Sequence, residues 1–378
     1  LKGRAFDDGT LRFLNVKALP SDLGLAFDEA AEAMPRARLT PASWRFEGDR
    51  LDAIRAKMAA GRPTLAEVYS APLRGIVTGL NEAFVLSRET RDALVARDPA
   101  SAELLKPFLI GENLKRWHVE SDDLWLIYTP KNRIDIEAYP AIRDHLLPFR
   151  ERLEARATKQ NWWELQQAQA AYAPAFDGPK IAYCDISNQP TFSIDRTGAR
   201  VANTVYFIPG DDSFLCALVN SRAAWFYLRG LTNIAQNGYL RLRTEFVSQL
   251  PIPEPTQVAE LVQALHLDAK SLSELVASIL HRLSDIAPAI ATTAAFRAWP
   301  DLDFAALRAL IGKRFRTDIA PGERDQWEQW YEGKRAEAAA LRARIADAEA
   351  EINARTYALF GLDGEEIQLI EDSLAGQY

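Results

Sequence analysis

The chain has 378 residues, of which 48% are hydrophobic and 26% charged, the balance of an ordinary folded protein long enough for two or three domains. Two cysteines exclude a disulfide framework and a cysteine-rich zinc site, and no apolar run is long enough for a membrane-spanning helix. A formal net charge of -7 argues at first sight against a nucleic-acid partner. No signal peptide is recognisable, so we expect a cytoplasmic protein that has no membrane partner.

Residues 1–60 are predicted to be a lead-in to the rest of the chain. They carry 10 basic and 9 acidic side chains and are rich in turn-forming residues, and only 49–60 is predicted to be helical. Because the chain begins at Leu1 rather than Met, we expect it to be part of a longer protein.

Residues 61–255 mix two kinds of signal. Short β-branched or aromatic runs predict strands at 75–78, 83–86, 124–128, 180–183, 191–194 and 204–208. Helices are predicted at 87–97, at 137–158 with an interruption at Pro148, and at 213–229. With 22 basic and 23 acidic side chains, this section is predicted to be a nearly neutral α+β domain, and the prolines between Pro251 and Pro255 end it.

Residues 256–378 have a helical periodicity. Leucine and isoleucine recur at helical spacing from Leu261 to Ile286, and a heptad-like pattern runs from Ala338 to Leu359. We expect two long helices packed antiparallel as a coiled-coil-like spacer. This section carries 13 basic and 20 acidic side chains, so the acidic excess of the chain lies here.

A search for catalytic motifs finds none. The chain has no glycine-rich dinucleotide or phosphate loop, no nucleophile elbow and no His-Glu-x-x-His pair. His266 and His281 fall in the predicted rod, where a solvated face explains them better than a metal site. Asp301 and Glu332 superficially resemble a magnesium-dependent nuclease site, but that chemistry needs carboxylates on adjoining strands. We therefore expect no catalytic residue and no metal site in this chain.

The stretch from Asn237 to Thr244 has the pattern of a strand with a binding face. Leu240 and Leu242 would point inward, whereas Tyr239, Arg241 and Arg243 would share the opposite face. Two guanidinium groups beside a phenol suit phosphate oxygens or the acceptor edge of guanine. The alternative is an exposed strand whose arginines form salt bridges.

Further candidate contacts lie in predicted loops, which commonly carry binding groups. They are the basic turns at Lys115, Arg116, Lys131 and Arg133, the segment with Lys159, Asn161 and Trp162, the turn at Asn188, and Thr78 and Asn81 on either side of Gly79. A solvated loop is the alternative for the basic turns, and a structural role for the Thr78–Asn81 turn. Basic groups concentrated in loops beside a long helical rod favour nucleic-acid binding over small-molecule catalysis.

Several segments, taken in order, resemble the TaqI-like C-terminal specificity domain of adenine-specific DNA methyltransferases and type IIG restriction–modification enzymes. The segments are Gly75–Leu86, Leu105–Leu109, Gly111–Trp117, Trp162–Leu165, Pro179–Ser187, Leu218–Ser221, Gly238–Tyr239 and Leu250–Pro253. The segment 352–367, with Tyr357–Leu362, is similar to the closing helix of the same enzymes. The resemblance covers about residues 40–255 well and the last helix moderately.

The resemblance implies a target recognition domain that reads double-stranded DNA. In such enzymes a separate catalytic domain holds S-adenosylmethionine and flips out the target adenine. That domain carries an (Asn/Asp/Ser)-Pro-Pro-(Tyr/Phe) motif, and this chain has no Pro-Pro pair. The resemblance therefore implies no cofactor in this chain and S-adenosylmethionine in its parent enzyme, whose catalytic methyltransferase domain would be a partner. Residues 1–60 would then be the junction from that missing catalytic domain. The alternatives are a stand-alone, non-enzymatic specificity subunit and a scaffold that binds proteins through the rod.

Overall fold

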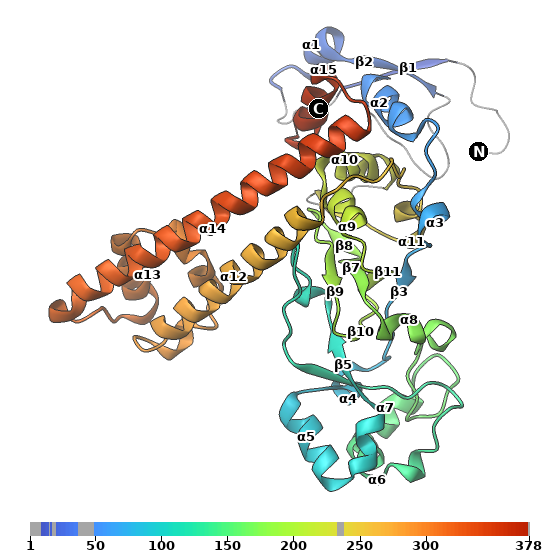
Figure 1. Ribbon diagram of the computed structural model, residues 1–378, viewed down its shortest axis with the longest axis vertical. Helices are drawn as coiled ribbons and strands as arrows, with labels where there is room; N and C mark the ends of the chain where they lie inside the picture. The colour runs from blue at the N-terminus through green and yellow to red at the C-terminus, as the bar shows by residue number, and fades with distance from the viewer. Residues whose placement is uncertain (1–8, 15, 17–19, 37–48, 233–237, 377–378) are drawn as a thin grey trace.

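The computed structural model describes residues 9–14, 16, 20–36, 49–232 and 238–376 (Figure 1). The fold is α+β: an elongated body of sheets and short helices, from which a pair of long helices projects as a rod (Figure 1). Asn237, at the start of the predicted alternating stretch, and much of the predicted lead-in lie outside the described residues.

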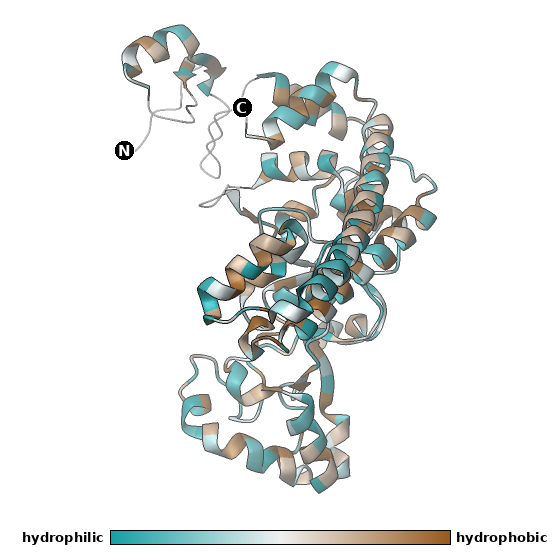
Figure 2. Ribbon diagram, turned by 90° about the vertical axis from the view of Figure 1, so that its left-hand side faces the viewer, coloured by the Kyte–Doolittle hydropathy of each residue, from teal (hydrophilic) through white to brown (hydrophobic). Residues whose placement is uncertain are grey.

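The N-terminal part forms a small hairpin that stands apart from the body (Figure 2). Strands β1 (Thr10–Phe13) and β2 (Glu32–Pro35) pair antiparallel around helix α1 (Leu23–Ala30). Helix α2 (Asp49–Ala59), by contrast, buries Leu51 and Ile54 in the core of the body, and it confirms the helix predicted at 49–60.

Two four-stranded sheets form the centre of the body. The first is antiparallel throughout, in the order β3 (Leu73–Arg74), β11 (Val205–Pro209), β7 (Lys180–Cys184) and β9 (Ser193–Asp195). The second has the order β10 (Arg200–Val201), β5 (Leu105–Leu109), β6 (Leu124–Ile127) and β4 (Val85–Leu86), with only β10 and β5 parallel. A two-stranded ribbon, β8 (Ile186–Ser187) with β12 (Leu240–Arg241), lies beside them.

Short helices surround these sheets. They are α3 (Leu65–Val68), α4 (Asn81–Phe84), α5 (Arg88–Arg97), α6 (Pro140–Leu146), α7 (Arg150–Glu154), α8 (Pro174–Asp177), α9 (Ser213–Asn220), α10 (Arg222–Leu231) and α11 (Thr244–Val247). Single 3₁₀ turns lie at η2 (Pro99–Glu103), η3 (Gly111–Asn113), η4 (Ile136–Ala138), η5 (Leu147–Phe149) and η6 (Ala170–Tyr172). Helices α4 to α7 make up the lower end of the body, and α2, α9 and α10 the upper end (Figure 1).

The strands predicted at 124–128, 180–183 and 204–208 are confirmed, and three other predictions need correction. Residues 75–78 form only isolated bridges, at Ile76 and Val77, because the chain turns sharply at Gly79. Of the strand predicted at 83–86, the first half belongs to α4, and only Val85–Leu86 is extended. Of the strand predicted at 191–194, only the last two residues lie in β9.

The helix predicted at 213–229 is divided between α9 and α10 because two polar side chains break it. The buried amide of Asn220 accepts from Phe192 N (3.1 Å) and donates to Phe192 O (2.8 Å). These bonds join the end of α9 to the residue that precedes β9. The Ser221 hydroxyl then accepts from Ala224 N (3.2 Å) and caps α10.

A buried ion pair lies across two strands of the first sheet. Lys180 on β7 is opposite Asp195 on β9, their charged atoms are 2.8 Å apart, and both side chains are fully buried. The Lys180 ammonium also donates to Phe176 O at 2.8 Å, and Asp195 accepts from Thr197 N and Oγ1. These additional hydrogen bonds are what a buried charge pair needs in order to be tolerated.

The rod consists of α12 (Ala259–Leu283) and α14 (Arg324–Leu359), which run antiparallel as predicted (Figure 1). The sequence did not predict the elements that join their far ends. These are η8 (Pro288–Ile290), η9 (Ala294–Asp301), α13 (Phe304–Phe315) and η10 (Pro321–Glu323), and they enclose a separate small core with Phe296, Trp299 and Tyr331. Helix α15 (Gly364–Leu374) then returns to the body and packs on α10 and α2. No helix among the described residues is long and apolar enough to cross a membrane.

Candidate nucleic-acid interface

The β8–β12 ribbon has the alternation that the sequence predicts. Leu240 and Leu242 are fully buried, whereas Tyr239 and Arg241 are exposed. Arg241 pairs directly with Ile186 of β8, and because directly opposite residues share a face, the exposed Ile186 lies beside the guanidinium. Two main-chain contacts fix the strand: Leu242 N donates to Asp185 O (2.7 Å), and Thr232 Oγ1 donates to Arg241 O (3.1 Å).

The cations of this ribbon are available to a ligand. No ion pair of Arg241 occurs within the described part of the chain, and the nearest carboxylate to Arg243 is that of Glu245, at 3.9 Å. Asn188 is exposed in the turn directly after β8. We call the set Asn188, Tyr239, Arg241 and Arg243 the ribbon face.

A second group of candidates lies at the lower end of the body, in two loops that one buried carboxylate holds together. Glu164 is fully buried and accepts from Asn132 N (2.6 Å), Asn161 N (2.7 Å) and Asn161 Nδ2 (3.2 Å). The Lys131 ammonium donates to Lys159 O (2.7 Å) and joins the same two loops. We call the segments 131–133 and 159–161 the paired loops.

The paired loops present polar side chains around an open cavity of about 440 Å³. Lys131, Arg133, Lys159 and Asn161 are all exposed. Trp162 is half-buried and makes an edge contact with Trp163, at a ring separation of 5.6 Å. Because Arg150 also lies over the Trp162 ring (5.4 Å), that indole is less free to stack on a base than the sequence suggested.

The turn containing Thr78 and Asn81 is tied to the paired loops through Arg156. Thr78 is buried and its hydroxyl donates to Asn81 Oδ1 (2.6 Å), while its carbonyl accepts from Arg156 Nη1 (3.1 Å). The same guanidinium donates to Trp162 O (3.2 Å), and its partial burial lowers the pKa of Arg156. Gly79 has φ +79°, and an added Cβ would lie 2.8 Å from the Arg156 side chain, so this turn requires glycine.

Lys115 and Arg116 lie elsewhere, where the body meets the rod. Arg116 donates to Asn220 O (2.9 Å) and pairs with Glu349 of α14 (3.1 Å), and burial lowers its pKa. Lys115 is half-exposed, 3.5 Å from Glu120. The next residue, Trp117, has a left-handed backbone (φ 74°), and its indole donates to Glu349 Oε1 (2.6 Å). The Arg116 guanidinium is thus occupied in joining body and rod.

The structure therefore separates the predicted contacts into three places. The ribbon face holds Asn188, Tyr239, Arg241 and Arg243; the lower end holds Thr78, Asn81, Lys131, Arg133, Lys159, Asn161 and Trp162; the rod junction holds Lys115 and Arg116. Sequence reasoning missed Glu164 and Arg156, which organise the lower group. The Trp162–Leu165 motif contains Glu164, but the motif alone does not indicate that this carboxylate accepts from Asn132 N and Asn161 N. The described residues bring together no group of three or more His, Cys, Asp or Glu side chains suited to a metal ion.

Two family models match the chain and meet at residue 252. The model of the TaqI-like C-terminal specificity domain matches residues 106–252. Residues 106–252 are a TaqI-like C-terminal specificity domain. The model of a domain of unknown function, DUF8810, matches residues 252–356, most of the rod. The ribbon face and the paired loops both lie within the specificity domain, whereas Thr78 and Asn81 precede it.

Individual proteins give partial matches. The chain is similar to the type II methyltransferase M.BanIII of Aneurinibacillus aneurinilyticus, with 26% identity over 205 residues, covering 48% of this chain. It spans about a third of that protein's length, 34%. A solved structure of the type IIL restriction-modification enzyme MmeI in complex with DNA aligns with 84% of this chain and 36% of its own, at a TM-score of 0.44 and 12% identity.

Proposed function

We propose that this chain reads DNA sequence as the target recognition part of a type IIG-like restriction–modification enzyme or an adenine-specific DNA methyltransferase. The observation that carries the proposal is that the specificity domain has an exposed arginine on its ribbon, Arg241, which forms no ion pair with any described residue. In this proposal the parent is a bacterial cytoplasmic enzyme. Its catalytic domain lies outside this chain, binds S-adenosylmethionine and supplies the methyl transfer, since the chain has no Pro-Pro pair.

The ribbon face is the part we assign to sequence reading. A two-stranded ribbon fits the major groove, and a guanidinium can donate two hydrogen bonds to the O6 and N7 of guanine. Arg241 is the best placed for this role, because the pairing of β8 with β12 fixes its backbone. Tyr239 and Arg243 share its face of the strand by alternation, and we assign them to phosphate or base contacts.

The paired loops are the part we assign to the DNA backbone and to a second set of bases. Lys131, Arg133 and Lys159 would contact phosphates, and the Asn161 amide suits adenine. Asn161 Nδ2 donates to Glu164 Oε1 (3.2 Å), and this hydrogen bond orients the amide. Thr78 and Asn81 would support these loops through Arg156. We assign the rod to orienting the domain on a partner.

The test measures binding of the chain to duplex DNA of mixed sequence, by fluorescence anisotropy, at about 50 and about 200 mM salt. We expect the affinity to fall steeply with salt, and the change Arg241→Ala with Arg243→Ala to weaken binding by about tenfold or more and to flatten the salt dependence. The matched control is Lys313→Ala with Arg314→Ala, which removes two exposed charges from α13 of the rod and should leave the affinity unchanged.

Two results would overturn the proposal. One is an affinity that does not respond to salt, and the other is an equal loss in both double variants. A selection from a randomised duplex pool would separate base reading from general attraction to phosphate. We expect the wild-type chain to enrich a common motif and the single variant Arg241→Ala not to enrich it.

A further inference from the structure

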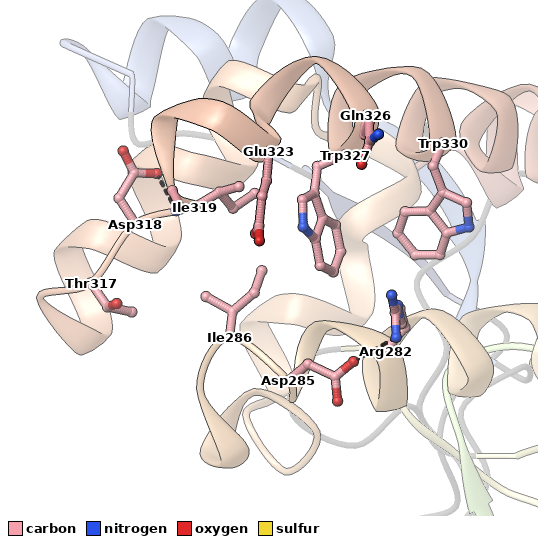
Figure 3. Close-up of a pocket in the computed structure, with 11 residues that line it drawn as sticks. Arg282, Asp285, Ile286, Thr317, Asp318, Ile319, Glu323, Gln326, Trp327 and Trp330 are labelled. Atoms are coloured by element: carbon pink, nitrogen blue, oxygen red, sulfur yellow. Dashed lines mark hydrogen bonds and ion pairs between the residues drawn. The ribbon is translucent and has the colours of Figure 1, made fainter.

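The far end of the rod contains a cavity of about 690 Å³ between the end of α12 and the start of α14 (Figure 3). It is lined by Arg282, Asp285, Ile286, Asp318, Ile319, Glu323, Trp327 and Trp330 among others. The far end of the rod projects away from the body, which carries the ribbon face and the paired loops (Figure 1). The proposed DNA contacts do not involve it.

One side of this cavity already holds a guanidinium from the chain itself. Arg282 lies over the Trp327 ring at 5.5 Å and pairs with Asp285 at 2.8 Å. Trp330 meets Trp327 edge to face, with ring centroids 5.3 Å apart, which fixes the orientation of that indole. A cation held between an aromatic face and a carboxylate is a stabilising arrangement, so the chemistry of the cavity suits such a group.

The other side of the cavity also has a carboxylate and an aromatic ring, but no cation lies between them among the described residues. The carboxylate of Glu323 points into the cavity beside Trp327 (Figure 3), and no hydrogen bond or ion pair of it occurs within the described ranges. Ile286 and the buried Ile319 provide an apolar surface next to it. Asp318, in contrast, is engaged by Arg308 (2.5 Å) and Arg324 (2.8 Å), so Glu323 is the carboxylate left for a ligand.

We propose that this cavity binds the arginine or lysine side chain of a basic polypeptide segment in a partner protein. The aliphatic stem of such a side chain would lie against Ile286 and Ile319, and its cation would lie between Glu323 and the Trp327 ring. The charge of the lining favours a basic ligand, because it holds three carboxylates, those of Asp285, Asp318 and Glu323, and one cation, Arg282. The same carboxylates would repel a phosphate group, so we assign this cavity to a protein ligand and not to DNA.

The test uses the whole chain with its tryptophan indoles labelled with ¹⁵N, which gives one indole signal from each of the nine tryptophans. The Trp327 signal is identified by its loss in Trp327→Phe. The probes are the capped tetrapeptide acetyl-Gly-Arg-Arg-Gly-amide, its Glu-Glu counterpart and a short DNA duplex. We expect the arginine peptide to shift the Trp327 signal, and the other two probes to leave it in place.

Two variants on the same helix separate a specific site from general charge attraction. Glu323→Gln should weaken the arginine peptide about fivefold, and Glu328→Gln, which removes an equal charge outside the cavity, should leave its affinity unchanged. Glu323→Lys should reverse the preference, so that the Glu-Glu peptide shifts Trp327.

Three outcomes would overturn the proposal. They are equal effects of the Glu323→Gln and Glu328→Gln changes, a shift of Trp327 by the duplex, and a shift of Trp327 on dilution alone, which would indicate a second copy of the chain as the occupant. None of these results depends on whether the ribbon face binds DNA.

Discussion

The specificity domain and the rod both pair charged side chains at their surfaces, but among the described residues only the specificity domain also has a fully buried ion pair. In the rod, exposed arginines are paired with carboxylates of a neighbouring element, as in Arg344–Asp268 (2.6 Å) and Arg342–Asp301 (2.5 Å). In the specificity domain, Lys180 and Asp195 are paired in the interior, whereas the exposed Arg241 has no carboxylate partner among the described residues. The net charge of -7 therefore says little about which face binds an anion. What matters is which cations the chain has already neutralised.

The largest effect is expected when one ion pair is broken in each region and the losses in the free energy of unfolding are compared. Asp195→Ala leaves the Lys180 ammonium buried without its carboxylate, and we expect the free energy of unfolding to fall by about 3–5 kcal/mol. Asp268→Ala removes the half-buried partner of the exposed Arg344 and should cost no more than about 1 kcal/mol. Urea unfolding of both variants measures the two effects. Losses of similar size would contradict the distinction between a buried and an exposed pair.

A second test concerns the buried carboxylate that holds the paired loops. In Glu164→Gln one oxygen becomes an NH₂ group that faces a backbone N–H, so we expect a loss of about 2 kcal/mol in the free energy of unfolding. We also expect weaker DNA binding, because Lys131 and Lys159 lose their fixed spacing. The control is Glu154→Gln, an exposed change beside the same cavity. Unchanged stability of Glu164→Gln would show that the loops are held by other contacts.

The sequence predicted those features whose cause is local. Alternation placed Leu240 and Leu242 inside and Arg241 outside, and helical periodicity predicted both long helices of the rod. These patterns work because burial follows directly from the period of a strand or a helix. The resemblance to the specificity domain depended in the same way on short segments in a fixed order.

The features that sequence reasoning missed depend on residues far apart in the chain. Arg116 resembled a DNA contact because it lies in a short basic turn, but Glu349, more than 200 residues later, pairs with it. Arg156 and Glu164 have no distinctive spacing from Thr78 or Asn132, although they fix the shape of both segments. The small core at the end of the rod was missed because η9 and α13 have no long period of their own.

The smallest expected effect lies at the boundary between the two regions, at Glu120. Its carboxylate lies beside the His118 ring (3.3 Å), accepts from Ser273 of α12 and is 3.5 Å from Lys115, and the His118 contact is the main reason that the pKa of Glu120 falls to about 2. A carboxylate with a lowered pKa stabilises the folded state above its ordinary pKa of 4.5, and this contribution is lost as the pH falls toward 2.

We therefore expect Glu120→Gln to cost about 1 kcal/mol at pH 7, since partial exposure screens the contact, and the difference from wild type to shrink steadily between pH 5 and pH 3. Urea unfolding across this range measures it. Glu274→Gln, an exposed change on the same face of α12 near the junction, is the control and should shift the unfolding free energy by less than about 0.5 kcal/mol. A difference for Glu120→Gln that grows on acidification would mean that the contact favours the protonated carboxyl, and the ionised Glu120 would then not join the specificity domain to the rod.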